Sequence, residues 1–165
     1  MQSKNIHCFL LCLFSFLVFG QTSGQSIGVP VESLGDGPWV FDTAEQHKIR
    51  VSVLARGMSH PWAIAFLPDG GMLVTEREGR LRLVQNDKLL EEPIPGVPSV
   101  RTDGNGGLMD VAIHPEFSEN QLVYLTYTKP VERGWGAPAL AVATLKNGAL
   151  VNTHDILVTE AYEGN

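Results

Sequence analysis

Short apolar segments recur along the chain from residue 49 onward, and turn residues separate them. Within 71–77 and 79–85, apolar and polar residues alternate with the period of two that is typical of strands with one buried face. No segment shows a long helical period, and 43–48 is the only short helix candidate. Strands are predicted at 49–55, 61–68, 71–77, 79–85, 108–115, 121–128, 139–146 and 155–161, with turns at 68–71, 78–79, 86–87 and 147–148.

This all-β pattern contains an internal repeat. The segments around Ala65 and Ala112 share one order of strand, turn and strand, and they lie 47 residues apart. A four-stranded blade of a β-propeller has a period of about 40–50 residues. The repeat therefore predicts a partial β-propeller of two to three blades. Because a propeller needs at least four blades to close, we expect an N-terminal piece of a longer protein. A complete small β-sandwich is the alternative.

The first 24 residues have the pattern of a secretory signal peptide. Lys4 precedes an apolar run over 8–19, which is shorter than the roughly 20 residues that a membrane span requires. An apolar N-terminal helix of the folded domain and a retained membrane anchor are the alternatives. Residues 25–48 are interpreted as a lead-in segment and 49–165 as the N-terminal part of the propeller. The protein is expected to be periplasmic or secreted, with no stable membrane span after signal removal.

Cysteine content and charge exclude several function classes. Cys8 and Cys12 both lie in the predicted signal, so the exported chain has no thiol for catalysis, zinc binding or a disulfide. Removal of Lys4 leaves 11 Lys and Arg against 18 Asp and Glu, a net charge of −7. A dispersed acidic surface of this kind argues against a nucleic-acid partner, whose phosphates require a basic face.

The segment 103–107, with the sequence DGNGG, is the strongest candidate for a ligand-binding loop. Its glycines permit a positive φ and a close backbone approach, and Asp103 and Asn105 add short polar groups. These two side chains can bind a ligand, or they can cap their own turn. Both interpretations stay open at this point.

Other polar residues carry weaker signals. Trp62 and His60 are predicted to pack between blades. Glu76 and Arg77 point to opposite faces of a strand, and a salt bridge to a neighbouring blade is favoured over ligand contact. Asp110 and His114 share a face of one strand, but two residues are too few for a zinc site.

Two stretches of the chain resemble a known family. HPWAIAFLPDGGMLVTEREGRLRLV, residues 60–84, and GNGGLMDVAIHPEFSENQLVYLTYT, residues 104–128, closely resemble the soluble glucose/sorbosone dehydrogenases that depend on pyrroloquinoline quinone. The resemblance extends over about 49–146. It implies a six-bladed propeller with the quinone at one end of the central channel, calcium assisting the quinone, an aldose substrate and an external electron acceptor.

The resemblance also implies a binding role for the glycine-rich loop. Asp103, Asn105 and Gly106 are the implied cofactor-binding residues, and Asn105 stands where the family carries a longer Gln. The family's catalytic His belongs to a sequence motif that is expected beyond residue 165, and the calcium ligands are expected there too. No residue of this chain is therefore assigned as catalytic. His154 lies in a different sequence motif and is not a candidate for the catalytic base.

The implied activity is oxidation of the sugar's anomeric hydroxyl to a lactone, with hydride transfer to the quinone. The chain alone is expected to be inactive because it lacks the base. A non-catalytic propeller of the same lineage that binds carbohydrate or protein is the alternative. A lactonase-like propeller is a third class, but the metal-binding set that it requires is not visible in the sequence.

Overall fold

The computed structural model describes residues 35, 37–45 and 47–161. Contacts divide the chain into 1–35 and 36–165, and only Gly35 of the first unit is described. The predicted signal peptide and most of 25–36 therefore lie outside the described residues. No described helix is long and apolar enough to span a membrane.

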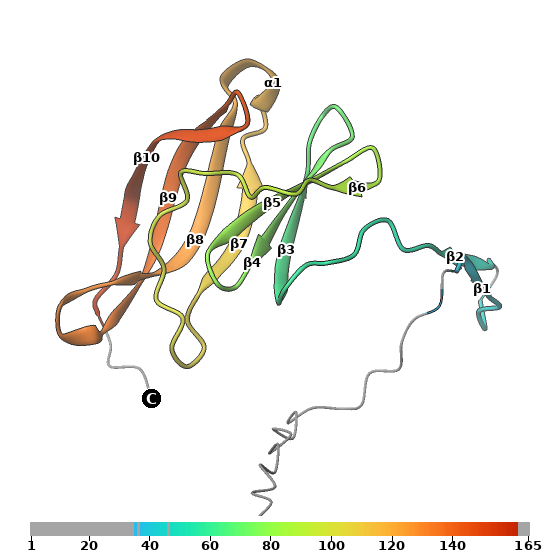
Figure 1. Ribbon diagram of the computed structural model, residues 1–165, viewed down its shortest axis with the longest axis horizontal. Helices are drawn as coiled ribbons and strands as arrows, with labels where there is room; N and C mark the ends of the chain where they lie inside the picture. Colours follow the sequence, from blue (N-terminus) through green and yellow to red (C-terminus); the bar gives the residue numbers. More distant parts are fainter. Residues whose placement is uncertain (1–34, 36, 46, 162–165) are drawn as a thin grey trace, which may run out of the picture. The chain divides into compact units, whose positions relative to one another are not determined.

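A first four-stranded antiparallel sheet, called blade 1 below, follows a short N-terminal hairpin (Figure 1). Its strands lie in sequence order, β3-β4-β5-β6. Gly70 and Gly79 take positive φ in the turns that follow β3 and β4, as the turn residues predicted. The bounds are β3 Pro61–Phe66, β4 Met72–Glu76, β5 Arg80–Gln85 and β6 Lys88–Leu89.

Blade 2 has the same arrangement, with β7 at one edge and β10 at the other. A one-turn helix, α1 (Phe117–Asn120), lies between its first two strands, and a short 3-10 turn at Glu132–Gly134 lies between the next two. The bounds are β7 Leu108–Ile113, β8 Leu122–Pro130, β9 Gly136–Lys146 and β10 Ala149–Val158.

The first strands of the two blades repeat each other in detail. β3 begins at Pro61 and β7 begins at Leu108, which is the 47-residue spacing seen in the sequence. Each pairing has one irregularity, between Pro61 and Ile64 in blade 1 and between Leu108 and Val111 in blade 2. The same bulge therefore occurs at equivalent positions of both blades.

A threonine hydroxyl closes each bulge. Thr75 Oγ1 accepts the Ala63 N–H at 3.0 Å, and Thr126 Oγ1 accepts the Asp110 N–H at 2.9 Å. Thr75 Oγ1 also donates to the carbonyl of Met109 at 2.6 Å, which joins β4 of blade 1 to β7 of blade 2. A threonine thus closes the bulge in each blade, and Thr75 also connects blade 1 to blade 2.

The main core lies between the two blades. β7 packs against both β3 and β4, and these neighbours are visible side by side in Figure 1. Leu73 and Leu81 of blade 1 share one cluster with Leu108 and Leu125 of blade 2, and all four are at most 1% exposed. Removal of these apolar surfaces from water is the main force that holds the blades together. Two consecutive blades of this kind confirm the predicted partial β-propeller.

The link between the blades, residues 90–107, runs from β6, an edge strand of blade 1, to β7, the first strand of blade 2. Ile94 bridges to Leu81 of β5, and the Pro95 carbonyl then accepts the Leu150 N–H of β10 at 2.8 Å. The Arg101 N–H donates to the Thr128 carbonyl of β8, also at 2.8 Å. These contacts fix the course of the link up to the start of β7.

Several strand predictions need correction. Strand character in 49–55 is confined to β2, Ile49–Val51, which pairs with the unpredicted strand β1, Trp39–Phe41. Residues 43–45 and 47–48 form no helix but belong to the connection between these strands. β10 begins at Ala149 and not at 155, because Leu150 pairs with Leu145 directly after the 147–148 turn. The two-residue strand β6 was not predicted either.

Candidate functional site

The predicted binding loop lies at a corner where three elements meet. These are the start of β3, the end of β4 with its following turn, and the loop 101–107 before β7. An open hollow at this corner is lined by His60, Pro61, Trp62, Arg77, Gly104 and Asn105. The structure thus brings the glycine-rich loop together with two residues that sequence analysis placed in the core.

The glycines of this loop are required by the chain's own backbone. A Cβ on Gly106 would lie 2.6 Å from the Arg101 carbonyl oxygen, and one on Gly107 would lie 2.5 Å from the Arg77 carbonyl oxygen. Gly107 also takes φ +147°. The expected close backbone approach is therefore present, and it is an approach to neighbouring protein. Gly106 itself is buried, its N–H donates to the Asp103 carbonyl and its carbonyl accepts from Arg77, so its predicted contact with a ligand stays a prediction.

Asn105 is exposed on this loop and does not cap the turn. The turn is closed by the backbone, with the Gly106 N–H donating to the Asp103 carbonyl at 3.0 Å. Within the described residues, no hydrogen-bond partner is recorded for the Asn105 amide. The turn-capping interpretation therefore fails for Asn105, while its proposed contact with a ligand stays a prediction.

Positive charge exceeds negative charge beneath the loop. Asp103 lies 3.4 Å from Nη2 of Arg101, and its carboxylate is 74% exposed. Nε and Nη1 of Arg101 are buried and have no hydrogen-bond partner in the described part of the chain. Arg77, the second cation, forms no ion pair with any described acidic residue. Arg101 is not among the residues that line the hollow, and the guanidinium of Arg77 is hydrogen-bonded to carbonyls of the loop. Sequence analysis missed Arg101, because nothing in its local pattern marks it.

Glu76 is a fully buried carboxylate at the end of β4. It accepts hydrogen bonds from the Ser59 N–H at 2.6 Å, from Arg80 Nε at 2.5 Å and from Arg82 Nη1 at 3.5 Å. Burial raises the pKa of Glu76, but the Ser59 N–H and the two arginines outweigh it and lower the pKa overall. The predicted inter-blade salt bridge is wrong here, since both arginines belong to β5 of the same blade.

A histidine–glutamate pair stands beside Glu76. Nδ1 of His60 lies 2.7 Å from Oε1 of Glu78, and His60 has φ +43°. The backbone N–H of Glu78 itself lowers the pKa of this carboxyl, and His60 and Arg80 add to the effect. An ionised Glu78 accepts the hydrogen bond from the Nδ1–H of His60.

The start of β3 does not pack between the two described blades. Trp62 is 60% exposed, and the side chain of His60 is 71% exposed. Both lie at the hollow and not between blades 1 and 2. Trp62, Ile64 and Phe66 of β3 are all exposed, whereas Ala65 is buried.

Asp110 and His114 form no metal site together. Asp110 Oδ1 accepts the Val111 N–H at 2.9 Å, whereas Nδ1 of His114 contacts Asn120 Nδ2 at 2.8 Å. Across the described residues, no group of three or more His, Cys, Asp or Glu side chains is placed to hold a metal ion. The calcium ligands were expected beyond residue 165, so calcium binding stays a prediction.

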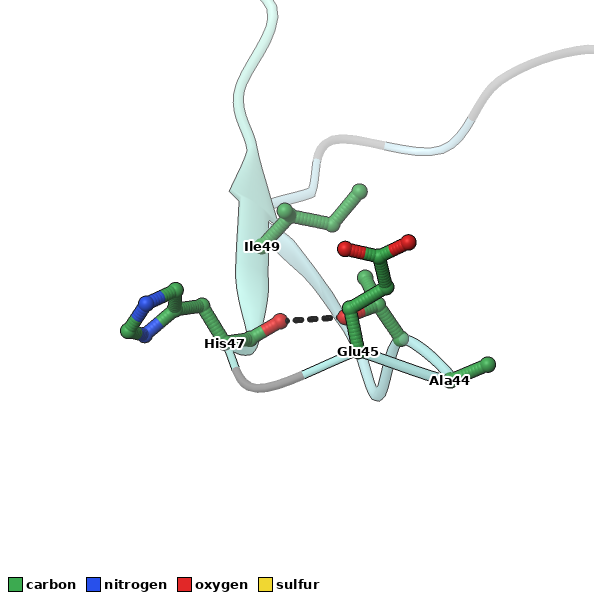
Figure 2. Close-up of a pocket in the computed structure, with 5 residues that line it drawn as sticks. Ala44, Glu45, His47 and Ile49 are labelled. Carbon is green, nitrogen blue, oxygen red and sulfur yellow. Dashed lines mark hydrogen bonds between the residues drawn. The ribbon is translucent and has the colours of Figure 1, made fainter.

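A second hollow lies beside the N-terminal hairpin (Figure 2). Thr43 Oγ1 donates to the His47 carbonyl at 2.6 Å, and the imidazole of His47 points away from the Glu45 carboxylate. The residues that line it are all exposed, so this hollow has no convergent polar groups for binding.

Two consecutive four-stranded blades, with an open hollow where β3 begins, define a partial β-propeller. The family model "Glucose / Sorbosone dehydrogenase" matches residues 58–164, and the chain belongs to this family.

Three relatives illustrate the similarity. The chain is 38% identical to the aldose sugar dehydrogenase YliI of Escherichia coli over 120 residues, which cover 72% of this chain and 31% of that protein. It is 28% identical to quinoprotein glucose dehydrogenase B of Acinetobacter calcoaceticus over 94 residues, covering 55% and 20%. A crystal structure of a glucose dehydrogenase superposes with a TM-score of 0.63 at 43% identity, covering 66% of this chain and 33% of that one. The match thus spans less than a third of these curated relatives.

Proposed function

We propose that the protein containing this chain is an exported aldose dehydrogenase that uses pyrroloquinoline quinone as its cofactor. Membership of the glucose/sorbosone dehydrogenase family carries this proposal. The relative named as a quinoprotein supports a quinone cofactor, and the relative named as an aldose sugar dehydrogenase supports the substrate class. The proposed reaction oxidises the anomeric hydroxyl to a lactone and passes electrons to an external acceptor.

The residues of this chain have a binding role in the proposal. The quinone, when bound, accepts the hydride equivalent from the sugar. Asn105 offers an amide donor and acceptor at the hollow, and Asp103 lies beside it. Gly106 shapes the loop, because its N–H is bonded to the Asp103 carbonyl and its carbonyl to Arg77. The catalytic histidine and the calcium ligands are proposed to lie in other parts of the protein.

The test is an assay of the whole protein, loaded with calcium and the quinone, for dye reduction with a panel of aldoses. Asn105→Ala is expected to lower kcat/KM by about 2- to 13-fold, the effect of one lost hydrogen bond of ~0.5–1.5 kcal/mol. Asn105→Gln is expected to maintain or raise it, because the longer side chain restores the family's reach. Gln85→Ala, which removes an amide at the far end of β5, is the control.

Two results would contradict the proposal at different points. Unchanged kinetics for Asn105→Ala would remove the loop from the site. A folded, quinone-loaded protein that reduces no dye with any aldose would favour the non-catalytic propeller, for which the short Asn105 is the supporting observation.

A further inference from the structure

Arg77 is fixed by its backbone between the first strands of the two blades. It follows β4, and its N–H donates to the His60 carbonyl at 3.1 Å, just before β3. Its own carbonyl accepts the Leu108 N–H at 2.9 Å, at the start of β7. The position of the Arg77 side chain is therefore set by both blades.

The guanidinium of Arg77 binds three carbonyl groups of one loop. Nε donates to the Gly106 carbonyl at 2.9 Å, and Nη2 donates to the Thr102 carbonyl at 2.8 Å. Nη2 also donates to the carbonyl of Gly104. These acceptors belong to alternate residues of the loop, so one planar group holds the whole of 102–106. Arginine suits this role because its N–H groups form a fixed fork, whereas the ammonium of lysine is a point charge.

The stem of Arg77 and the glycines of the loop fit each other closely. A Cβ on Gly107 would lie 2.6 Å from Cγ of Arg77. No described acidic side chain pairs with the guanidinium, so its recorded partners are main-chain carbonyls. The packing and the hydrogen bonds thus commit Arg77 to the loop.

Asn105 lies between two of the bound carbonyls, those of Gly104 and Gly106. Its amide is without a recorded partner in the described part of the chain, and it lines the hollow with His60 and Trp62. We propose that Arg77 is a positioning residue that holds this loop so that the Asn105 amide faces the bound ligand. The inference rests on the proposed function, since that function supplies the ligand.

Arg77→Lys tests the role, because lysine retains the charge and loses the fork. If Arg77 acts through Asn105, the variant loses the ordered amide and kcat/KM falls by about the same 2- to 13-fold as in Asn105→Ala. Arg50→Lys is the matched control, because Arg50 is exposed on β2. A merely structural role would lower the melting temperature of Arg77→Lys and leave kcat and KM of the folded enzyme unchanged.

A double-mutant cycle separates positioning from an independent effect. In the Asn105→Ala background, Arg77→Lys is expected to cause no further loss in kcat/KM. The same cycle is measured on the affinity for the quinone by fluorescence titration without sugar. Losses that multiply in both measurements would overturn the positioning role.

Hydrogen exchange provides a readout that does not depend on turnover. The amides of Gly106 and Leu108 should exchange faster in Arg77→Lys than in the wild type, and not in Arg50→Lys. Unchanged exchange would overturn the inference even if activity fell. A wild-type protein that binds no quinone and oxidises no sugar would overturn the proposed function. If the wild type is active but the losses in kcat/KM and in quinone affinity of Arg77→Lys and Asn105→Ala multiply in the double mutant, only the positioning role of Arg77 is overturned.

Discussion

Replacement of Thr75 by valine should destabilise the protein by removing one hydroxyl at the junction of the blades. The side chain is fully buried, and valine has nearly the same shape. The hydroxyl has two partners, the Ala63 N–H at 3.0 Å and the Met109 carbonyl at 2.6 Å. Both groups lose this partner in Thr75→Val.

The magnitude follows from these two contacts. A hydrogen bond contributes about 0.5–1.5 kcal/mol net, and a buried group left without a partner costs about 1–3 kcal/mol. Ala63 and Met109 are only half-buried, so the lower half of the range applies to each. The expected loss in unfolding free energy is therefore about 2–4 kcal/mol.

Equilibrium urea unfolding, followed by tryptophan fluorescence, measures this loss. Thr75→Ser keeps the hydroxyl and should lose only about 1 kcal/mol, the value of a buried methyl. Thr126→Val is the internal control, because this hydroxyl is half-buried and closes the equivalent bulge with a single recorded hydrogen bond, from Asp110. It should cost about 1 kcal/mol. A wild-type urea midpoint for Thr75→Val, or equal losses for Thr75→Val and Thr126→Val, would refute the reasoning.

Three further predictions concern stability. Glu76→Gln should cost about 3 kcal/mol in urea unfolding, because removal of one partner leaves Arg82 buried without its counter-ion; a loss below about 1 kcal/mol would contradict this. Asp155 has a lowered pKa, so its contribution to the free energy of unfolding is complete above pH 3.8, the ordinary pKa of the group, and is lost as the pH falls through the pKa of the folded protein. Asp155→Asn should therefore flatten the plot of melting temperature against pH in this range, and an unchanged plot would argue against the prediction. Gly107→Ala should lower the free energy of unfolding by about 1–3 kcal/mol, through backbone strain and the close contact with Arg77. An unchanged melting temperature would show that the loop adjusts to the added methyl group.

Local chemistry determined most of the strand pattern. The Asn147–Gly148 turn, with both residues at positive φ, separates β9 from β10 as the sequence predicted. Alternation located β4 and β5 to within one residue at each end. The internal repeat also predicted the two blades. These features depend on residues that are neighbours in sequence, so the sequence contains their physical causes.

The partners of the polar residues were decided by tertiary structure. Arg77 meets carbonyls 25 to 29 residues away, and Arg101 acquires its burial from elements outside its own loop. The exposure of Trp62 depends on which face of β3 the next blade covers. The sequence alone determined that DGNGG is a special loop, because glycine has a distinctive backbone. Only the packing of two blades decided that those glycines accommodate the chain's own arginine and carbonyl groups, because such contacts arise from the spatial approach of distant segments.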